Sequence, residues 1–204
     1  MPVTTSRFAE WLAGIFVIFF IWMGIAPVDR GVWVAEIVPV AFVFLLLVLT
    51  VRAFRFTPAA YLFMAFWLFW HTVGGHYTFA NVPFGFITDM LGASRNHFDR
   101  VGHFSVGFYA YAMAELLTRR RLAGPVVTTL FGLFFIMAVA AGYEILEWWY
   151  AVSNDPAAGD AFLGSQGDVW DAQKDMLADT LGAIFSLAVF WTLGRWWGSH
   201  TPVG

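Results

Sequence analysis

The 204-residue sequence predicts an all-α polytopic membrane protein, a single domain built as a bundle of about six transmembrane helices. The composition is 60% hydrophobic and only 12% charged, whereas soluble domains carry about 25% charged residues. The hydrophobic residues are gathered in long runs, and one crossing of a membrane by a helix uses about 20 residues. Backbone polar groups in lipid must be satisfied within the chain, so runs of this length are expected to be helices.

Six apolar runs divide the chain. They cover residues 9–27, 34–51, 58–74, 99–117, 124–150 and 173–193. Pro27, Pro58 and Pro125 stand at or near run ends, where helices commonly begin or end. Pro39 lies inside the second run and predicts a kink there. Arg7 is the only basic residue before the first run, and no small-x-small cleavage site follows the run. We therefore expect a retained span rather than a signal peptide.

The connections between the runs differ in length. Residues 28–33, 52–57 and 118–123 are short, whereas about 75–98 and about 151–172 form long connections rich in Gly, Asn, Asp and aromatic residues. Long ordered loops often carry function. The alternative is that both are solvated loops outside the membrane.

The basic residues predict which side of the membrane each connection occupies. If the N-terminus is inside, the inner segments carry seven basic residues and the outer segments carry four. The inner ones are Arg7, Arg52, Arg55, Arg119, Arg120, Arg121 and Arg195, and the outer ones are Arg30, Arg95, Arg100 and Lys174. By the positive-inside rule this distribution favours an N-in/C-in topology, with both long connections outside.

Ionisable residues gather at the outer ends of the third to sixth runs. Asp99 and His103 are four residues apart and therefore share a helix face, and Glu144 and Glu147 are three apart. The sixth run begins with acids spaced by three, four and four residues, which form one stripe if the helix starts early enough. These acids are Asp168, Asp171, Asp175 and Asp179. The predicted topology thus brings four helix ends with polar groups to one face, while the first two runs are expected to support them.

The acids at this face outnumber the fixed positive charges. Seven acids stand against Arg95, Arg100 and Lys174. An aspartate at the centre of a membrane helix costs about 2.5–3.5 kcal/mol, so such groups must be protonated, paired or bound to a cation. A divalent metal ion resolves the deficit, and mixed carboxylate and imidazole ligands suit zinc, manganese or iron. The predicted ligands are Asp99, His103, Glu144, Asp175 and Asp179.

The first functional hypothesis is a membrane-embedded, metal-dependent enzyme, hydrolase-like, that acts on a lipid or lipid-linked substrate from the outer leaflet. The metal would lower the pKa of a bound water. Glu147, Asp171 or His76 would serve as the general base. Arg95 and Arg100 would bind an anionic headgroup of the substrate.

Two other hypotheses remain open. In one, the acids form a cation or proton site of a transport protein, which predicts polar residues continuing to the inner face. In the other, the polar cluster is a hydrogen-bonded plug that fixes the register of a non-catalytic scaffold. A nucleic-acid partner is excluded because no basic surface is apparent and the net charge is −3. The absence of cysteine excludes thiolate sites and disulfides.

The polar segments resemble those of the YjdF family of bacterial inner-membrane proteins, most strongly over residues 70–182. The matching stretches are residues 71–76, 95–104, 143–148 and 166–176. This resemblance implies a multi-pass protein of the bacterial inner (cytoplasmic) membrane and implies no particular reaction.

More distantly, the chain is similar to VanZ-like membrane proteins, which are associated with glycopeptide resistance. Their pattern pairs an Asp-Lys-x-x-His-Phe segment with a later Glu and an Asp-x-x-x-Asn-x-x-Gly helix. Residues 99–104, Glu144 and residues 175–182 stand in comparable positions. Asp179 replaces the Asn and Glu147 replaces the usual Gln, so this site is more acidic.

Overall fold

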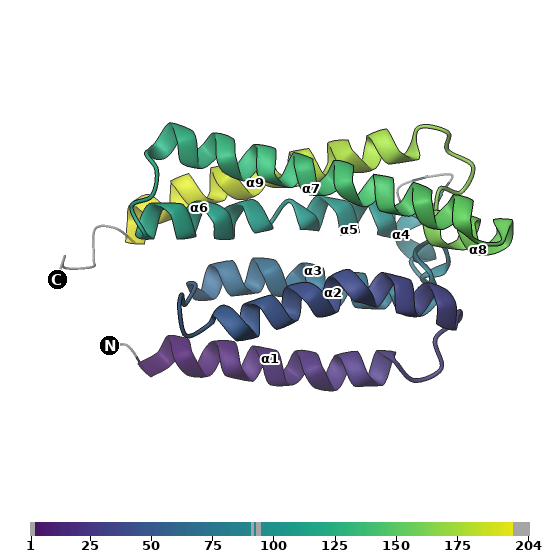
Figure 1. Cartoon of the computed structure of the whole chain (residues 1–204), viewed down its shortest axis with the longest axis horizontal. Helices are drawn as coiled ribbons and strands as arrows, with labels where there is room; N and C mark the ends of the chain where they lie inside the picture. The colour runs from purple at the N-terminus through teal and green to yellow at the C-terminus, as the bar shows by residue number, and fades with distance from the viewer. Residues whose placement is uncertain (1–2, 91, 93–94, 198–204) are drawn as a thin grey trace.

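The computed structural model describes residues 3–90, 92 and 95–197, and these residues form helices and connections without a β-strand (Figure 1). The elements are α1 (Val3–Met23), α2 (Arg30–Thr50), α3 (Pro58–Tyr77), η1 (Phe79–Asn81), α4 (Gly85–Met90), α5 (Phe98–Val106), α6 (Tyr109–Arg119), α7 (Pro125–Ser153), α8 (Pro156–Leu163) and α9 (Asp171–Trp197). The all-α prediction is confirmed. Among the described residues, α2, α7 and Asp171–Thr192 of α9 are each long and apolar enough to cross a membrane.

Several helices begin where the sequence provides a cap. The side chain of Asp29 accepts a hydrogen bond from the backbone N–H of Val32 at 2.9 Å, which satisfies a free donor in the first turn of α2. Thr57 caps α3 in the same way, and Pro58 follows at a position where a helix needs no N–H donor. Pro125 opens α7 after Gly124.

The fourth apolar run forms two helices, α5 and α6, rather than one. Between them the N–H of Phe108 bonds to the carbonyl of Ser105, and the N–H of Ala110 bonds to the carbonyl of Gly107, a tighter pattern than the α-helix. The hydroxyl of Ser186 on α9 donates to the carbonyl of Gly107 at 2.8 Å. A side chain from a neighbouring helix therefore bonds the backbone where the run is interrupted, a common cause of helix breaks.

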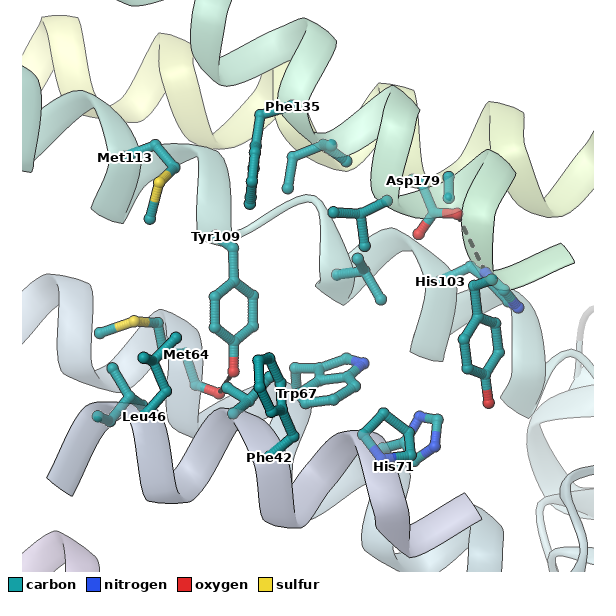
Figure 2. A pocket seen from close by; sticks show the side chains of 18 of the residues that line it. Phe42, Leu46, Met64, Trp67, His71, His103, Tyr109, Met113, Phe135 and Asp179 are labelled. Atoms are coloured by element: carbon teal, nitrogen blue, oxygen red, sulfur yellow. Dashed lines mark hydrogen bonds and ion pairs between the residues drawn. The ribbon is translucent and has the colours of Figure 1, made fainter. Parts of the chain in front are cut away.

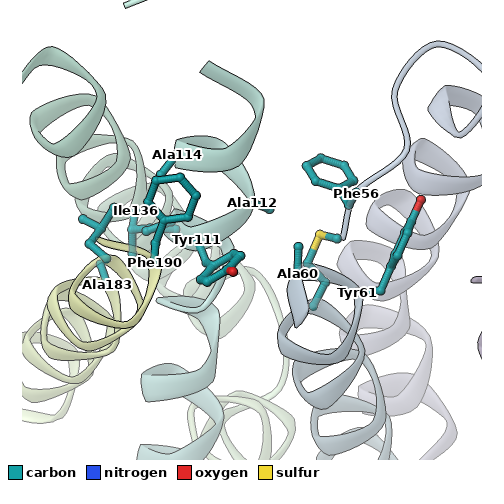
Figure 3. Packing of buried hydrophobic residues seen from close by; sticks show 12 residues of the cluster. Phe56, Ala60, Tyr61, Tyr111, Ala112, Ala114, Ile136, Ala183 and Phe190 are labelled. Carbon is teal, nitrogen blue, oxygen red and sulfur yellow. The ribbon is translucent and has the colours of Figure 1, made fainter. Parts of the chain in front are cut away.

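The helices form two groups that meet at α3. Figure 1 shows α1, α2 and α3 side by side, with α5, α6, α7 and α9 forming the other group. Residues of α3 pack against α1 and α2 and also against α5 and α6. In the second group, Ala114 of α6, Ile136 of α7 and Phe190 of α9 belong to one buried apolar cluster. Figure 3 shows these three side chains gathered together. Large exposed side chains such as Leu49 on α2 and Val126 on α7 leave an apolar outer surface suited to lipid.

The two long connections contain short helices instead of open loops. The first holds η1 and α4, and the second holds α8. Phe79, Val82 and Phe98 form a buried aromatic and aliphatic cluster beneath the first connection. The aromatic content of these segments explains the difference, because burying such side chains gives a connection a fixed structure.

Helices α5 and α9 cross with their backbones in contact. Gly182 lies against the backbone of Phe104, and Gly107 lies against the backbone of Gly182 and Ala183. A Cβ atom at either glycine would overlap those backbone atoms. Small residues at helix crossings allow such close approach in membrane bundles, and here they set the spacing between the two helices that carry most of the acids.

A buried acid, Glu115, joins the end of α6 to the start of α3. Glu115 on α6 is 2% exposed and accepts hydrogen bonds from the backbone N–H of Thr57 at 2.8 Å and from its hydroxyl at 2.7 Å. Arg119 pairs with the same carboxylate. Glu115 therefore fixes the start of α3 to α6.

We expect Glu115→Ala to lower the free energy of unfolding by about 3 kcal/mol, because it leaves the polar groups of Thr57 without their charged acceptor. Thermal unfolding in detergent measures the loss. The control is Arg119→Ala, which removes a half-exposed partner and should cost about 1 kcal/mol or less. Equal losses in both variants would contradict the anchoring role.

Candidate acidic and histidine site

Buried acids of α9 meet Asp99 and a histidine of α5 near the start of both helices. Asp99, His103, Asp175 and Asp179 are each 8% exposed or less. One ligand atom from each of Asp99, His103 and Asp175 lies within 4.8 Å of the others. The four-residue spacing of Asp99 and His103 on α5, and of the two aspartates on α9, places each pair on one helix face. The site therefore results from two short sequence patterns on helices held close by their glycines.

The histidine is oriented by an aspartate through one ring nitrogen. Nδ1 of His103 lies 3.1 Å from Oδ2 of Asp179, and its N–H donates there if the carboxylate is ionised. Nε2 lies 3.6 Å from Oδ1 of Asp99 and 3.7 Å from Oδ1 of Asp175. Ligand atoms bound at about 2.1 Å to a tetrahedral metal are about 3.4 Å apart, so the two separations from Nε2 are close to the spacing of ligands.

Two arginines pair with the acids at the start of α9. Nη1 of Arg95 lies 2.6 Å from Oδ1 of Asp171 and 3.4 Å from Oδ2 of Asp168. Arg100 pairs with Asp171 and also with Oδ1 of Asp175, the oxygen that faces His103. The charges of both arginines are therefore matched by carboxylates of this chain.

Asp168 stands outside the spans, ahead of the first turn of α9. Its carboxylate accepts a hydrogen bond from Lys174 at 2.6 Å. This bond, together with the backbone N–H of Trp170, lowers the pKa of Asp168 below its usual value. Because α9 begins at Asp171, Asp168 is not part of the helical stripe, and it remains an ionised partner for the basic residues around it.

The remaining predicted site residues take different places. Glu147 is 8% exposed and lines the large cavity described below. Glu144 has a buried Oε1 atom without a hydrogen-bond partner among the described residues, and it lies outside the three-residue metal grouping. His76 is directed elsewhere, because its Nδ1 lies 2.6 Å from the carbonyl oxygen of Met23 and its ring packs against Trp33.

A second buried histidine and acid face the first pair. Nε2 of His71 on α3 lies 3.0 Å from Oε2 of Glu36 on α2, and the hydroxyl of Tyr143 on α7 donates to the same oxygen at 2.9 Å. The Tyr143 ring centroid is 6.2 Å from that of His71 and 6.3 Å from that of His103. Tyr143 therefore stands between two histidine and carboxylate pairs that come from separate halves of the bundle.

A cavity of about 890 Å³ extends from these groups into the bundle. His71, His103, Tyr143, Asp99, Glu147 and Asp179 line its polar end. Mostly apolar side chains of α2, α3, α6 and α7 line the remainder, and Thr50 and Arg120 line the far end. Figure 2 shows Asp179, His103 and His71 at one end and Met113, Leu46 and Met64 at the other, with Trp67 and Tyr109 between them. The site thus combines a polar end with a long apolar chamber, as ligand pockets commonly do.

Comparisons with known proteins identify the family. The family described as "Predicted membrane protein (DUF2238)" matches residues 8–195. The chain belongs to this family. It is also 38% identical to the inner membrane protein YjdF of Escherichia coli (strain K12) over 170 residues, which is 82% of this chain and 81% of that protein. The resemblance to the YjdF family and the location in the bacterial inner membrane are thereby confirmed. No solved structure matches the chain.

In this DUF2238 chain, sequence reasoning missed the contribution of α2 to the site. The first two runs were expected only to support the others, yet Glu36 is 1% exposed and reaches His71. A signal was present, because an acid inside an otherwise apolar span is a functional candidate by default. Gly75 on α3 lies against the Cβ atom of Glu36, so a small residue again permits the approach of two helices.

Proposed function

We propose that this protein is a membrane-embedded, metal-dependent enzyme that acts on the headgroup region of a lipid or lipid-linked substrate from the outer leaflet. One observation carries the proposal. Asp99, His103 and Asp175 converge in a buried group whose ligand atoms lie within 4.8 Å, at the polar end of a cavity that is otherwise apolar. A lipid has the same division between a polar headgroup and an apolar chain.

In this proposal a divalent ion is held by Asp99, Nε2 of His103 and Asp175. Asp179 orients His103 through Nδ1, as carboxylates next to metal-bound histidines commonly do. A bound ion would lower the pKa of a water molecule toward neutrality. It would also neutralise part of the acidic excess, with Glu144 and its unpartnered oxygen as a further nearby acid.

Residues that line the cavity are the candidates for proton transfer in such a reaction. His71 is oriented by Glu36 and lines the cavity, so it joins Glu147 as a candidate general base. Asp171 and His76 are weaker candidates, because Asp171 is paired with Arg95 and Arg100 and His76 contacts Met23. Most side chains that line the cavity between the acidic cluster and Arg120 at the far end are apolar, which favours an enzyme over ion transport.

We infer a topology of six spans with both termini inside. The spans are α1, α2, α3, α5 together with α6, α7 and α9, which correspond to the six apolar runs. Figure 1 places α4 and α8 at one end of the bundle, and the start of α1 and the turn from α6 to α7 at the other. The run Arg119-Arg120-Arg121 is in that turn region, on the side that the positive-inside rule assigns to the cytoplasm.

Elemental analysis of the purified protein tests the metal. Detergent-solubilised wild type, stripped with a chelator and reloaded with Mn²⁺ or Zn²⁺, should retain an equimolar amount of metal after desalting. His103→Ala and Asp175→Asn should lose it. Asp179→Asn should keep the ligands but bind metal about 10- to 100-fold more weakly, because it removes the group that orients His103.

The matched control is Asp160→Asn, which neutralises an exposed acid of α8 outside the grouping of Asp99, His103 and Asp175 and should leave the metal content unchanged. A folded wild-type protein that retains no metal after loading would overturn the proposal.

A further inference from the structure

We propose that the cavity holds the hydrocarbon chain of a membrane lipid, which enters sideways between α2 and α7 and leaves its headgroup at the acidic cluster. This inference rests on the proposed function, because it names the substrate class and the entry route of the same site. It is carried by the cavity's dimensions, its opening and one unsatisfied polar group.

The apolar part of the cavity is at least as long as one lipid leaflet, because its lining continues past the end of α2 to Ala53, Phe54 and Arg120. Along α2 its lining extends from Pro39 to Thr50, which spans about 16 Å at the helical rise of 1.5 Å per residue. Half of the hydrocarbon core of a bilayer is about 15 Å thick. Met64, Tyr109 and Ile136 line this part from α3, α6 and α7. A hydrocarbon chain that starts at the polar end can therefore extend through the chamber parallel to the chains outside.

The cavity is open on the side between α2 and α7. Phe42 and Leu46 on α2 line it and are 66% and 48% exposed on the protein surface. Phe135 and Val139 on α7 line it and are 38% and 42% exposed. Side chains that border a cavity and the outer surface at once form the rim of an opening.

This opening faces the bilayer rather than water. All four rim residues are apolar and belong to helices that are long and apolar enough to cross a membrane. The most abundant molecule at such a rim is a lipid, and its chains are as apolar as the lining. An unfilled apolar chamber would also forfeit the dispersion contacts of its walls, so occupation by a lipid chain is favourable.

An unsatisfied donor marks where the chain and the headgroup would meet. The indole N–H of Trp67 is buried and has no hydrogen-bond partner among the described residues, and Trp67 lines the cavity. Its ring lies 4.9 Å from that of His71 at the polar end and 5.6 Å from that of Tyr109 in the apolar part. Buried donors are nearly always paired, so an oxygen of the substrate near the start of its chain is the expected acceptor.

Photo-crosslinking tests the inference. The protein is reconstituted in vesicles with a diacyl phospholipid that carries a diazirine near the methyl end of one acyl chain, and labelled peptides are identified by mass spectrometry. Wild type should be labelled at cavity residues such as Met64, Tyr109 and Ile136. Ala140→Phe fills the chamber from a buried wall position of α7 and should lose this labelling.

The matched control is Ala138→Phe, the same substitution at an exposed position of α7 outside the cavity lining, which should keep the labelling. If Ala140→Phe does not fold, Val43→Phe fills the same chamber from α2. Labelling confined to outer residues such as Leu49 and Val126 in the wild type would overturn the inference. Cavity labelling that persists in a folded Ala140→Phe or Val43→Phe protein would also overturn the inference.

The same samples separate this inference from the proposed function. His103→Ala should lose metal and keep the acyl-chain labelling, whereas Ala140→Phe should keep metal and lose the labelling. Wild type that binds metal without cavity labelling would leave the enzyme proposal standing and reject the chain site. Wild type with cavity labelling but without metal would reject the enzyme proposal and leave the acyl-chain site standing.

Discussion

Gly182→Ala is expected to destabilise the protein by about 3 kcal/mol or more, the upper end of the cost of overpacking. The added methyl group would overlap the backbone of Phe104, and neither helix can yield locally because the obstacle is main chain rather than a flexible side chain. Helices α5 and α9 would have to separate. Chemical or thermal unfolding in detergent measures the loss.

The same substitution should disturb the acidic site. Asp179 is less than one turn from Gly182 and contacts His103, which is next to Phe104. Metal affinity is therefore expected to fall together with stability. The control is Gly142→Ala on α7, where a Cβ atom meets nothing within 4 Å. Alanine is about 1 kcal/mol better than glycine in a helix, so this variant should be neutral or more stable. Similar stability of the two variants would contradict the observed crossing.

Arg100→Met is the second large effect that we expect, with a loss of about 3 kcal/mol in the metal-free protein. Arg100 is paired with Asp171 and Asp175, and Asp175 is 2% exposed. Removing one partner of a buried ion pair leaves an uncompensated charge, which costs about 3–5 kcal/mol. Methionine keeps the volume of the side chain, so the loss reports the charge rather than a void.

Two comparisons sharpen this prediction. Arg100→Lys should recover only part of the stability, because an ammonium group cannot reproduce the planar fork that reaches both aspartates. Added Mn²⁺ or Zn²⁺ should raise the unfolding temperature of Arg100→Met more than that of wild type, since a bound cation would take over the neutralisation of Asp175. An Arg100→Met protein as stable as wild type without metal would show that the ion pairs of Arg100 with Asp171 and Asp175 do not stabilise the protein.

The helices could be predicted from the sequence because membrane spans depend on length and hydropathy alone. The break at Gly107 could not, since it depends on Ser186, which is 79 positions away in the chain. The site likewise has features that depend on local sequence and features that depend on contacts between distant residues. The spacing of Asp99 and His103 is local and visible in the sequence, and the structure does bring this pair to Asp175.

The contributions that depend on which helices are neighbours had to come from the structure. His76 lies just after the predicted third run, and its ring contacts the carbonyl of Met23, whereas His71, five positions earlier, lines the cavity. Arg95 and Arg100 were predicted to bind a headgroup, and their pairing with acids of α9 depends on the packing of α9 against α5. Glu36 became part of the site only because α2 lies against α3.

An experimental structure of the Mn²⁺-loaded protein with anomalous scattering data tests most directly whether the acidic and histidine cluster binds a metal ion. We expect one buried anomalous peak bound by Asp99, Nε2 of His103 and Asp175, with ligand distances of about 2.0–2.2 Å. Asp179 should remain on Nδ1 of His103, and Arg100 should have moved away from Asp175. A folded, loaded protein without a peak there, with Arg100 still paired to Asp175, would contradict the claim and identify the cluster as a polar plug that holds the helices together.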